Sequence, residues 1–153
     1  MTGTVYFQKF DIGWLRLESS DDAIVGVDYV DEAGEPATPD SVIEQCIREL
    51  GEYFNGDRQA FDVKINPGAH GTPFQQSVWQ ELRQIPYGET ISYKTLAERI
   101  SGSNYSRAVA NANGKNPISI IIPCHRVIAS NNTLGGYTGG LDKKKLLLSV
   151  EGR

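Results

Sequence analysis

The sequence predicts an α+β fold in which an antiparallel sheet comes first and helices follow. Three segments within residues 4–30 are rich in β-branched and aromatic residues and alternate roughly between apolar and polar positions. Beyond residue 40, four longer segments repeat apolar residues at helical spacing. Strands followed by helices indicate the α+β class.

The charge is divided unevenly along the 153 residues. Residues 1–72 carry five Lys or Arg against fourteen Asp or Glu, net −9, whereas residues 73–153 carry ten against five, net +5. The length suits one domain, or two small ones that share a core. The asymmetry suggests one acidic, solvated half and one half able to meet phosphate.

Composition also excludes several classes of protein. No apolar run approaches a membrane span and no segment suggests export, so we expect no membrane partner. The two cysteines lie far apart and make no disulfide framework, which favours a reducing cytoplasm. Two His and two Cys without paired spacing make no credible zinc site, so we expect no metal.

The N-terminal part predicts an antiparallel meander and one helix. Strands are expected at residues 5–8, 14–17 and 24–29, with turns between them. A helix over residues 41–54 places Cys46 on its apolar stripe, so this thiol is interpreted as packing. Residues 61–65 alternate and predict one more strand. The loop at residues 66–71 is the expected junction between domains 1–70 and 71–153.

Three helices are expected next. Thr72, Pro73 and Gln75 form a capping box at the start of the first. Ser92 can cap the second, and a short Gly-containing turn separates it from a third over residues 105–113, as in a helix-turn-helix. The third helix offers small and amide side chains that let its backbone approach another surface closely. That surface is either a groove floor or a packed neighbour.

The most unusual stretch follows the apolar run 118–122, which should be buried. Pro123 leads directly into Cys124, His125 and Arg126, and such a polar triplet is costly to bury without partners. Imidazole and guanidinium groups lower a thiol pKa and favour the thiolate. A cysteine that only packs in the core is the alternative.

The last segments predict a loop and a helix. Residues 129–140 are rich in Ser, Asn, Thr and Gly, and are expected to form a loop with a short hairpin or wing. Tyr137 within it can stack on a planar ligand or pin the loop to the body. A helix over residues 141–150 turns Leu146, Leu147 and Val150 inward, and the run 143–145 of three lysines is interpreted as a solvated face.

Together these motifs resemble the O6-alkylguanine-DNA alkyltransferase family, also called methylated-DNA–protein-cysteine methyltransferases. Order and spacing match from about residue 71 to 153. The resemblance is carried by Pro123-Cys124-His125-Arg126-Val127 and by residues 71–75, 86–93, 106–109, 114–117, 135–140 and 151–152. The positions that bind zinc in some members lack Cys and His here, and Leu146 stands where many members have Trp.

The resemblance implies a fold and a chemistry. The fold is a small N-terminal α/β domain with an antiparallel sheet, then a helical C-terminal domain with a winged helix-turn-helix. Cys124 would take the alkyl group of O6-alkylguanine once and irreversibly, without a cofactor, mainly from O6-methylguanine and also from O4-methylthymine. Its implied catalytic partners are His125 as base, Glu151 as orienter, Tyr93 and Asn116.

The implied partner is double-stranded DNA, bound through the minor groove by a cytoplasmic, nucleoid-associated monomer, either singly or cooperatively along the DNA. Arg107 would fill the space left by the flipped base. The resemblance also implies two further groups of residues. The DNA-binding group is Arg107, Tyr93, Ser92, Ala108, Ala110, Asn111, Ala112 and Asn113, and the substrate pocket is Val127, Ser130, Tyr137, Thr138 and Gly139.

Three other functions are weighed against this one. A non-catalytic relative that binds alkylated DNA and recruits repair factors would typically lack the reactive cysteine, which is present here. A helix-turn-helix regulator would leave the Cys124 stretch without a purpose. A Cys–His hydrolase would need an oxyanion site and an acyl pocket, and the sequence suggests neither.

Overall fold

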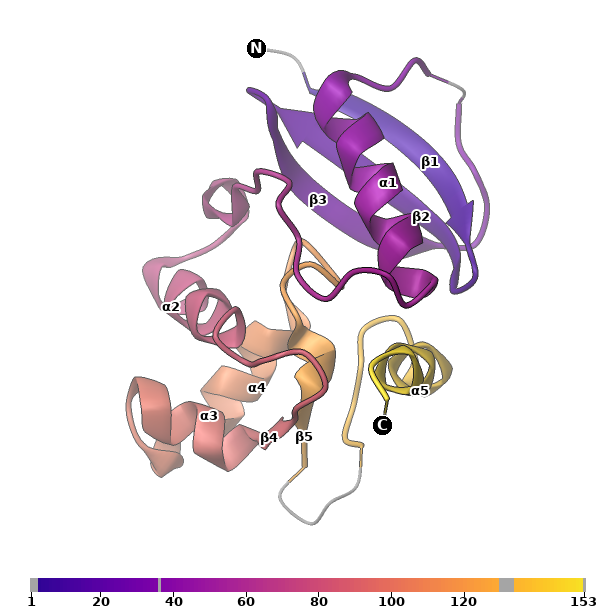
Figure 1. The fold of residues 1–153 in the computed structure, drawn as a ribbon. Coiled ribbons are helices and arrows are strands. Elements are labelled where there is room, and N and C mark those ends of the chain that lie inside the picture. Colours follow the sequence, from indigo (N-terminus) through magenta and orange to yellow (C-terminus); the bar gives the residue numbers. More distant parts are fainter. Residues whose placement is uncertain (1–2, 36, 130–133, 153) are drawn as a thin grey trace. The chain divides into compact units, whose positions relative to one another are not determined.

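The computed structural model describes residues 3–35, 37–129 and 134–152, and the chain divides into two compact units (Figure 1). The first unit is Met1–Ala69 with Pro117–Ser119, and the second is His70–Asn116 with Ile120–Arg153. An antiparallel sheet with one helix in the first unit, and a mainly helical second unit, confirm the predicted α+β class. The sequence predicts a single boundary, between residues 70 and 71. In the structure, Pro117–Ser119 also belong to the first unit.

The first unit contains an antiparallel sheet in the order β1-β2-β3 (Figure 1). Its strands are β1 (Thr4–Phe10), β2 (Gly13–Ser20) and β3 (Ala23–Val30). Asp21 and Asp22 take positive φ angles of 52° and 63° in the two-residue turn from β2 to β3, as a tight hairpin of matching twist requires. Alternate residues of β2 are buried, which explains the period that the sequence shows.

Helix α1 (Ser41–Phe54) packs against this sheet (Figure 1). Asp40 caps its start by accepting a hydrogen bond from the Ile43 amide. The strand predicted over residues 61–65 is wrong, because Ile65 makes one isolated bridge to Ile24. The amides of Asp62 and Val63 donate instead to the buried Glu49 carboxylate of α1, at 2.9 and 3.0 Å.

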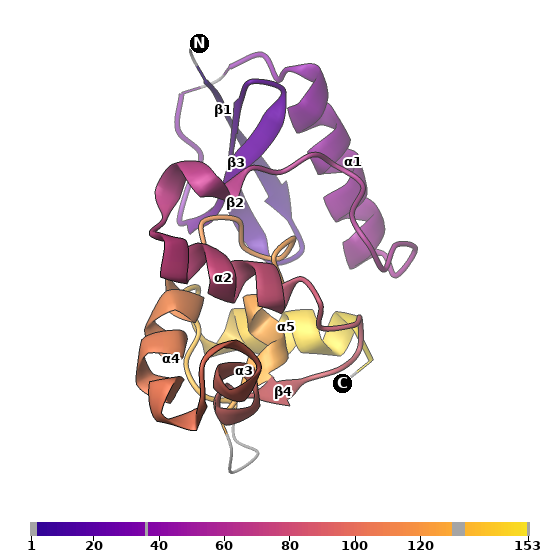
Figure 2. The same ribbon diagram turned by 90° about the vertical axis from the view of Figure 1, so that its left-hand side faces the viewer.

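The second unit is mainly helical (Figure 2). Its helices are α2 (Pro73–Leu82), α3 (Tyr93–Ile100), α4 (Ser106–Gly114) and α5 (Leu141–Val150), with 3₁₀ turns at Ser103–Tyr105 and Cys124–Arg126. A further 3₁₀ turn, Pro67–His70, lies where the units divide. Two short parallel strands pair within the second unit, β4 (Ile91–Ser92) and β5 (Val127–Ile128).

Helix α2 fixes the position of α4. The predicted capping box of Thr72 and Gln75 is present. The buried indole of Trp79 donates a hydrogen bond from Nε1 to the carbonyl oxygen of Ala112, at 2.9 Å. Gly71 allows this arrangement, since a Cβ atom there would lie 2.3 Å from the Trp79 ring. Helices α2 and α4 therefore meet through a specific polar contact as well as apolar packing (Figure 2).

The apolar run 118–122 is largely buried but forms turns rather than a strand. Ile120 takes a positive φ of 73°, an uncommon conformation for a β-branched residue. Part of the predicted wing falls on residues 130–133, outside the described residues, and no strand forms in the described remainder of residues 129–140. Within the described ranges, no helix is both long and apolar enough to span a membrane.

Candidate active site

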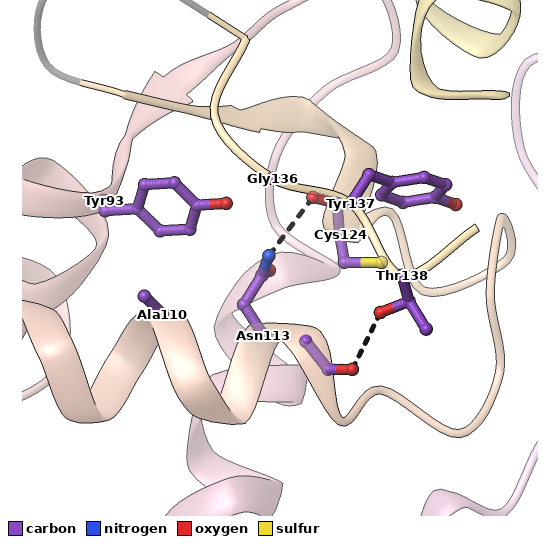
Figure 3. Close-up of a pocket in the computed structure, with 8 residues that line it drawn as sticks. Tyr93, Ala110, Asn113, Cys124, Gly136, Tyr137 and Thr138 are labelled. Atoms are coloured by element: carbon purple, nitrogen blue, oxygen red, sulfur yellow. Dashed lines mark hydrogen bonds between the residues drawn. The ribbon is translucent and has the colours of Figure 1, made fainter. Parts of the chain in front are cut away.

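Cys124 lies at the wall of a cavity of about 340 Å³ in the second unit (Figure 3). It is the first residue of the 3₁₀ turn Cys124–Arg126, and its amide donates to the Ile122 carbonyl at 2.8 Å. Its side chain is nearly buried, with 3% of the residue exposed. The residues that line the cavity are Tyr93, Ala110, Asn113, Gly114, Cys124, Gly136, Tyr137 and Thr138.

The surroundings of the thiol act on its pKa in two directions. Burial is the largest influence and raises the pKa of Cys124. A hydrogen bond from Asn116, the positive charge of Lys144 and a hydrogen bond from Tyr137 lower it in part. The net shift is upward, so the resting thiol keeps its proton at neutral pH and needs a base to become a nucleophile.

His125 has the properties of that base. Its Nε2 lies 2.7 Å from Oε2 of Glu151, and both side chains are fully buried. A carboxylate can only accept a hydrogen bond, so Nε2 carries the proton and Nδ1 carries the lone pair. Burial lowers the pKa of His125, which keeps the ring neutral. Among the described residues, the buried Nδ1 has no hydrogen-bond partner.

Glu151 is held in place by several donors. Arg126 donates from Nε to Oε1 at 2.8 Å and from Nη2 to Oε2 at 3.0 Å, a bidentate ion pair. The Gly88 amide donates to Oε1 at 3.2 Å. Arg126 also donates from Nη1 to the Ile85 carbonyl at 2.7 Å. Arg126 thus anchors the carboxylate that orients His125, a role that adjacency to Cys124 did not indicate.

Lys144 belongs to the site although the sequence pattern placed it on a solvated face. It is fully buried, and Nζ donates to the carbonyls of Val127 at 2.7 Å, Gly136 at 3.2 Å and Leu134. Burial lowers its pKa from the ordinary 10.5 to about 8, while the charge of Cys124 acts in the opposite direction. Lys144 therefore ties the pocket loop to β5 and brings positive charge towards the thiol.

A signal for Lys144 was present in the sequence. Lys144, Leu147, Leu148 and Glu151 are spaced as one helical stripe, and all four are buried. The predicted inner face of α5 included Leu146 and Val150, which are half-buried instead. Three consecutive lysines concealed the stripe, because at most one of them can face inward.

Three further predicted site residues are positioned by α3 and by the segment that leads to Cys124: Tyr93, Ser92 and Asn116. Tyr93 is the first residue of α3 and lines the cavity (Figure 3). Asn116 donates from Nδ2 to the Ile122 carbonyl at 2.7 Å, which joins the end of α4 to the approach to Cys124. The Ser92 hydroxyl caps α3 by accepting from the Thr95 amide at 3.0 Å.

Helix α4 presents only part of the expected DNA-facing set to solvent. Arg107, Ala108 and Asn111 are exposed, whereas Ala110 lines the cavity. Ala112 and Asn113, also predicted to face DNA, lie on the buried side of the helix. The Trp79–Ala112 hydrogen bond turns this side towards α2, and Asn113 faces the cavity.

The predicted pocket residues are also divided. Tyr137 and Thr138 line the cavity, and the Thr138 hydroxyl donates to the Gly114 carbonyl at 2.8 Å, joining the loop to α4 (Figure 3). Val127 is buried in β5 and Gly139 lies beyond Thr138, and neither is among the lining residues. Ser130 lies outside the described residues. Across the described ranges, no group of three or more His, Cys, Asp or Glu could hold a metal ion.

Comparisons with known proteins point to one group of relatives. Residues 73–153 match the family described as 6-O-methylguanine DNA methyltransferase, DNA binding domain, and residues 3–67 match its ribonuclease-like domain. A methylated-DNA–protein-cysteine methyltransferase of Methanosarcina acetivorans is 42% identical over 156 residues, covering 97% of this chain and 99% of that protein. A protein of the same name from Mycolicibacterium paratuberculosis is 42% identical over 147 residues, covering 93% of this chain and 88% of that protein.

Solved structures agree with the sequence comparisons. The crystal structure of Mycobacterium tuberculosis O6-methylguanine methyltransferase has a TM-score of 0.86 at 39% identity, covering 98% of this chain and 93% of that one. A Mycobacterium tuberculosis OGT in complex with DNA has the same TM-score and identity, covering 96% and 91%.

Proposed function

The chain belongs to the 6-O-methylguanine DNA methyltransferase family, and from that premise we propose that Cys124 is the residue that accepts the alkyl group. The protein is a DNA-repair alkyltransferase, and DNA is its partner. Its substrate is O6-alkylguanine, mainly O6-methylguanine, and also O4-methylthymine. A bond forms between Sγ and the alkyl carbon, the bond from that carbon to the base oxygen breaks, and the thiol proton passes to the departing base.

The observation that carries this proposal is that Nδ1 of His125, the residue next to Cys124, is buried without a hydrogen-bond partner in the part of the chain that the structure describes. Glu151 fixes the tautomer that leaves a lone pair on Nδ1, and that lone pair takes the thiol proton through a bridging water. The buried carboxylate then stabilises the imidazolium. Tyr93 assists protonation of the departing base. The product thioether is stable, so each molecule reacts once and no cofactor is required.

Helix α4 supplies the proposed approach to DNA. Arg107, Ala108 and Asn111 form its exposed face, which we place in the minor groove. Small side chains suit a narrow groove, and Arg107 enters the stack where the alkylated base leaves it. Unstacking costs on the order of a few kcal/mol, so a side chain that fills the space favours the extruded base. The protein acts as a monomer in the cytoplasm.

Mass spectrometry of digested peptides tests the transfer to Cys124. The protein is incubated with a duplex oligonucleotide that contains O6-methylguanine and is then digested. We expect the Cys124 peptide to gain one methyl group and the Cys46 peptide to gain none, and Cys124→Ser to gain none at either position. If the duplex is bound but no peptide gains mass, the protein is a non-catalytic binder of alkylated DNA.

Substitution of Arg107 tests the proposed extrusion of the base. Arg107→Ala should slow repair of duplex DNA by on the order of tenfold or more, because the space left by the extruded base stays unfilled. Reaction with the free base O6-methylguanine, which needs no extrusion, should change little. Arg99→Ala, an exposed arginine on α3, is the matched control for lost positive charge. Equal losses on duplex and free base would remove Arg107 from this role.

A further inference from the structure

Asn113 is buried in the last turn of α4 and faces the same cavity as Cys124 (Figure 3). Only 5% of the residue is exposed. Its Nδ2 donates to the carbonyl oxygen of Cys124 at 3.5 Å, and a hydrogen bond from Asn113 also acts on Tyr93. A carbonyl oxygen can only accept, so the amide nitrogen must point to Cys124 and the amide oxygen must point away.

The amide oxygen of Asn113, Oδ1, is not used by these hydrogen bonds. Among the residues that the structure describes, Oδ1 of Asn113 has no hydrogen-bond partner although it is buried. An unpaired buried acceptor is costly, because it has lost its hydrogen bonds to water, so folded chains rarely keep one without a use. The backbone on both sides of it is fixed by the Trp79–Ala112 and Asn116–Ile122 hydrogen bonds, so α4 cannot readily turn Oδ1 to solvent.

The chemistry of the proposed substrates shows which donor can meet this acceptor. Alkylation at O6 removes the proton from N1 of guanine, and the remaining ring nitrogens of the base are acceptors. The 2-amino group is then the one N–H donor left on the base. O4-alkylthymine has lost its N3 proton in the same way and carries no amino group, so it offers no N–H donor at all.

We infer that Oδ1 of Asn113 accepts a hydrogen bond from the 2-amino group of the extruded O6-alkylguanine, which makes Asn113 a specificity-determining residue. This inference rests on the proposed function and assigns one contact within it. A substrate without the amine leaves Oδ1 unpaired in a closed complex. Sites built to hydrogen-bond a polar group reject analogues that lack it, so guanine lesions are favoured over thymine lesions.

The test pairs a deletion in the substrate with a deletion in the protein. Single-turnover rates are measured with duplexes that contain O6-methylguanine, O6-methylhypoxanthine, which lacks only the 2-amino group, or O4-methylthymine. Wild-type protein should react on the order of tenfold or more faster with O6-methylguanine than with O6-methylhypoxanthine. Asn113→Leu, which keeps the volume and removes the acceptor, should bring that ratio close to one by slowing the guanine reaction.

Two further variants make the outcome specific. Asn111→Ala, on the exposed face of the same helix, should leave the ratio of the two purine rates unchanged even if DNA binding weakens. Asn113→Ala repeats the deletion with a smaller side chain in case Asn113→Leu fails to fold. Circular dichroism establishes that each variant is folded before rates are compared.

Each outcome either supports or overturns the assignment of Asn113 as the acceptor for the 2-amino group. Equal wild-type rates on the two purines, or a ratio that survives in both Asn113 variants, would overturn the assignment, as would a uniform loss on all three substrates. A collapse of the ratio with O6-methylhypoxanthine repair retained would support it. If wild-type protein methylates Cys124 with none of the three duplexes, the proposed function itself fails, and this outcome is distinct from the others.

Discussion

Each of the two units buries one cysteine and one glutamate among the described residues, yet the two pairs are surrounded differently. In the first unit, Glu49 accepts hydrogen bonds from the amides of Asp62 and Val63 and, at 2.8 Å, from the side chain of Gln45. Both carboxylate oxygens are occupied, and Nη2 of Arg48 also lies 3.9 Å from Oε2. Burial, and then the charge of Glu49, raise the pKa of Cys46 to about 12.

In the second unit, the corresponding network ends in an unpaired atom. Arg126 and Gly88 hold Glu151, Glu151 orients His125, and the buried Nδ1 of His125 has no partner within the described residues. The charge that acts on Cys124 is the positive charge of Lys144, which lowers the pKa of the thiol. Burial of a thiol and a carboxylate is therefore not what distinguishes a reactive site. In the proposed reaction, the difference lies in the Nδ1 lone pair of His125, which meets no donor among the described residues, and in a cation that favours the thiolate.

Matched substitutions of the two glutamates should separate the regions most strongly. In Glu151→Gln, the amide can donate to Nε2 of His125, which moves the ring proton to Nδ1 and removes the base. We expect alkyl transfer to fall by about 10²–10⁴-fold, the usual contribution of general acid–base catalysis. Glu49→Gln should lower the free energy of unfolding by about 1–3 kcal/mol through lost hydrogen bonds and leave the transfer rate of folded protein unchanged. Single-turnover transfer and denaturant unfolding measure the two effects.

A control is needed because Glu151→Gln also leaves Arg126 as an unpaired buried charge, which costs about 3–5 kcal/mol. The double variant Glu151→Gln, Arg126→Gln removes both charges and should recover much of the lost stability without recovering transfer. If transfer returned together with stability, the carboxylate would act as a structural group like Glu49, and the contrast between the units would disappear.

The sequence carries enough information for most of the first unit and for the helix starts of the second. Turn chemistry and alternation locate the three strands, and the Thr72–Gln75 capping box locates α2. The strand predicted at residues 61–65 failed for a reason no local pattern contains, because Glu49, thirteen residues before Asp62, takes the amides that a neighbouring strand would need.

The site is less predictable than the fold because it depends on pairs that lie far apart in the chain. Arg126 and Glu151 are separated by 25 residues, and their ion pair follows from neither helix period nor charge pattern. The resemblance of the sequence to a known family brought Glu151 into the site, but it placed Asn113 on the DNA-facing side. In the structure, the indole of Trp79 binds the carbonyl of the preceding residue, Ala112, and Asn113 lines the cavity.

Removal of the Lys144 charge is expected to raise the pKa of Cys124 further, as the surroundings of Cys46 raise the pKa of that thiol. Lys144→Met keeps an apolar chain of similar length and removes the cation that lowers the pKa of Cys124. We expect transfer at pH 7 to fall on the order of tenfold, since one nearby unit charge is worth roughly 1 kcal/mol or more in such a site. The rate–pH curve should move towards higher pH. A variant with an unshifted curve would show that Lys144 acts on the loop carbonyls alone.

The same variant changes how stability depends on pH. The pKa of Lys144 is about 8 in the folded protein against an ordinary 10.5, so the unfolded chain binds more protons between these values. The wild type should therefore gain up to about 3 kcal/mol relative to Lys144→Met as the pH rises from 8 to 10.5, and nothing below 8. Urea unfolding of both proteins at pH 7, 8, 9 and 10.5 measures this difference, and a flat difference would contradict the burial of a charged Lys144.

The smallest effect is expected for substitution of Cys46. The comparison of the two buried cysteines predicts that Cys46 contributes to packing in the first unit and not to alkyl transfer. Cys46→Ala removes one fully buried sulfur from the stripe of α1 that faces the sheet, so the free energy of unfolding should fall by about 1–2 kcal/mol. Because burial and the charge of Glu49 both raise the pKa of this thiol and keep it protonated, the rate of transfer to Cys124 and its pH dependence should match the wild type. A transfer rate that fell while the protein stayed folded would mean that the first unit takes part in the reaction, and buried cysteines of the two units could no longer be treated as one inert and one reactive.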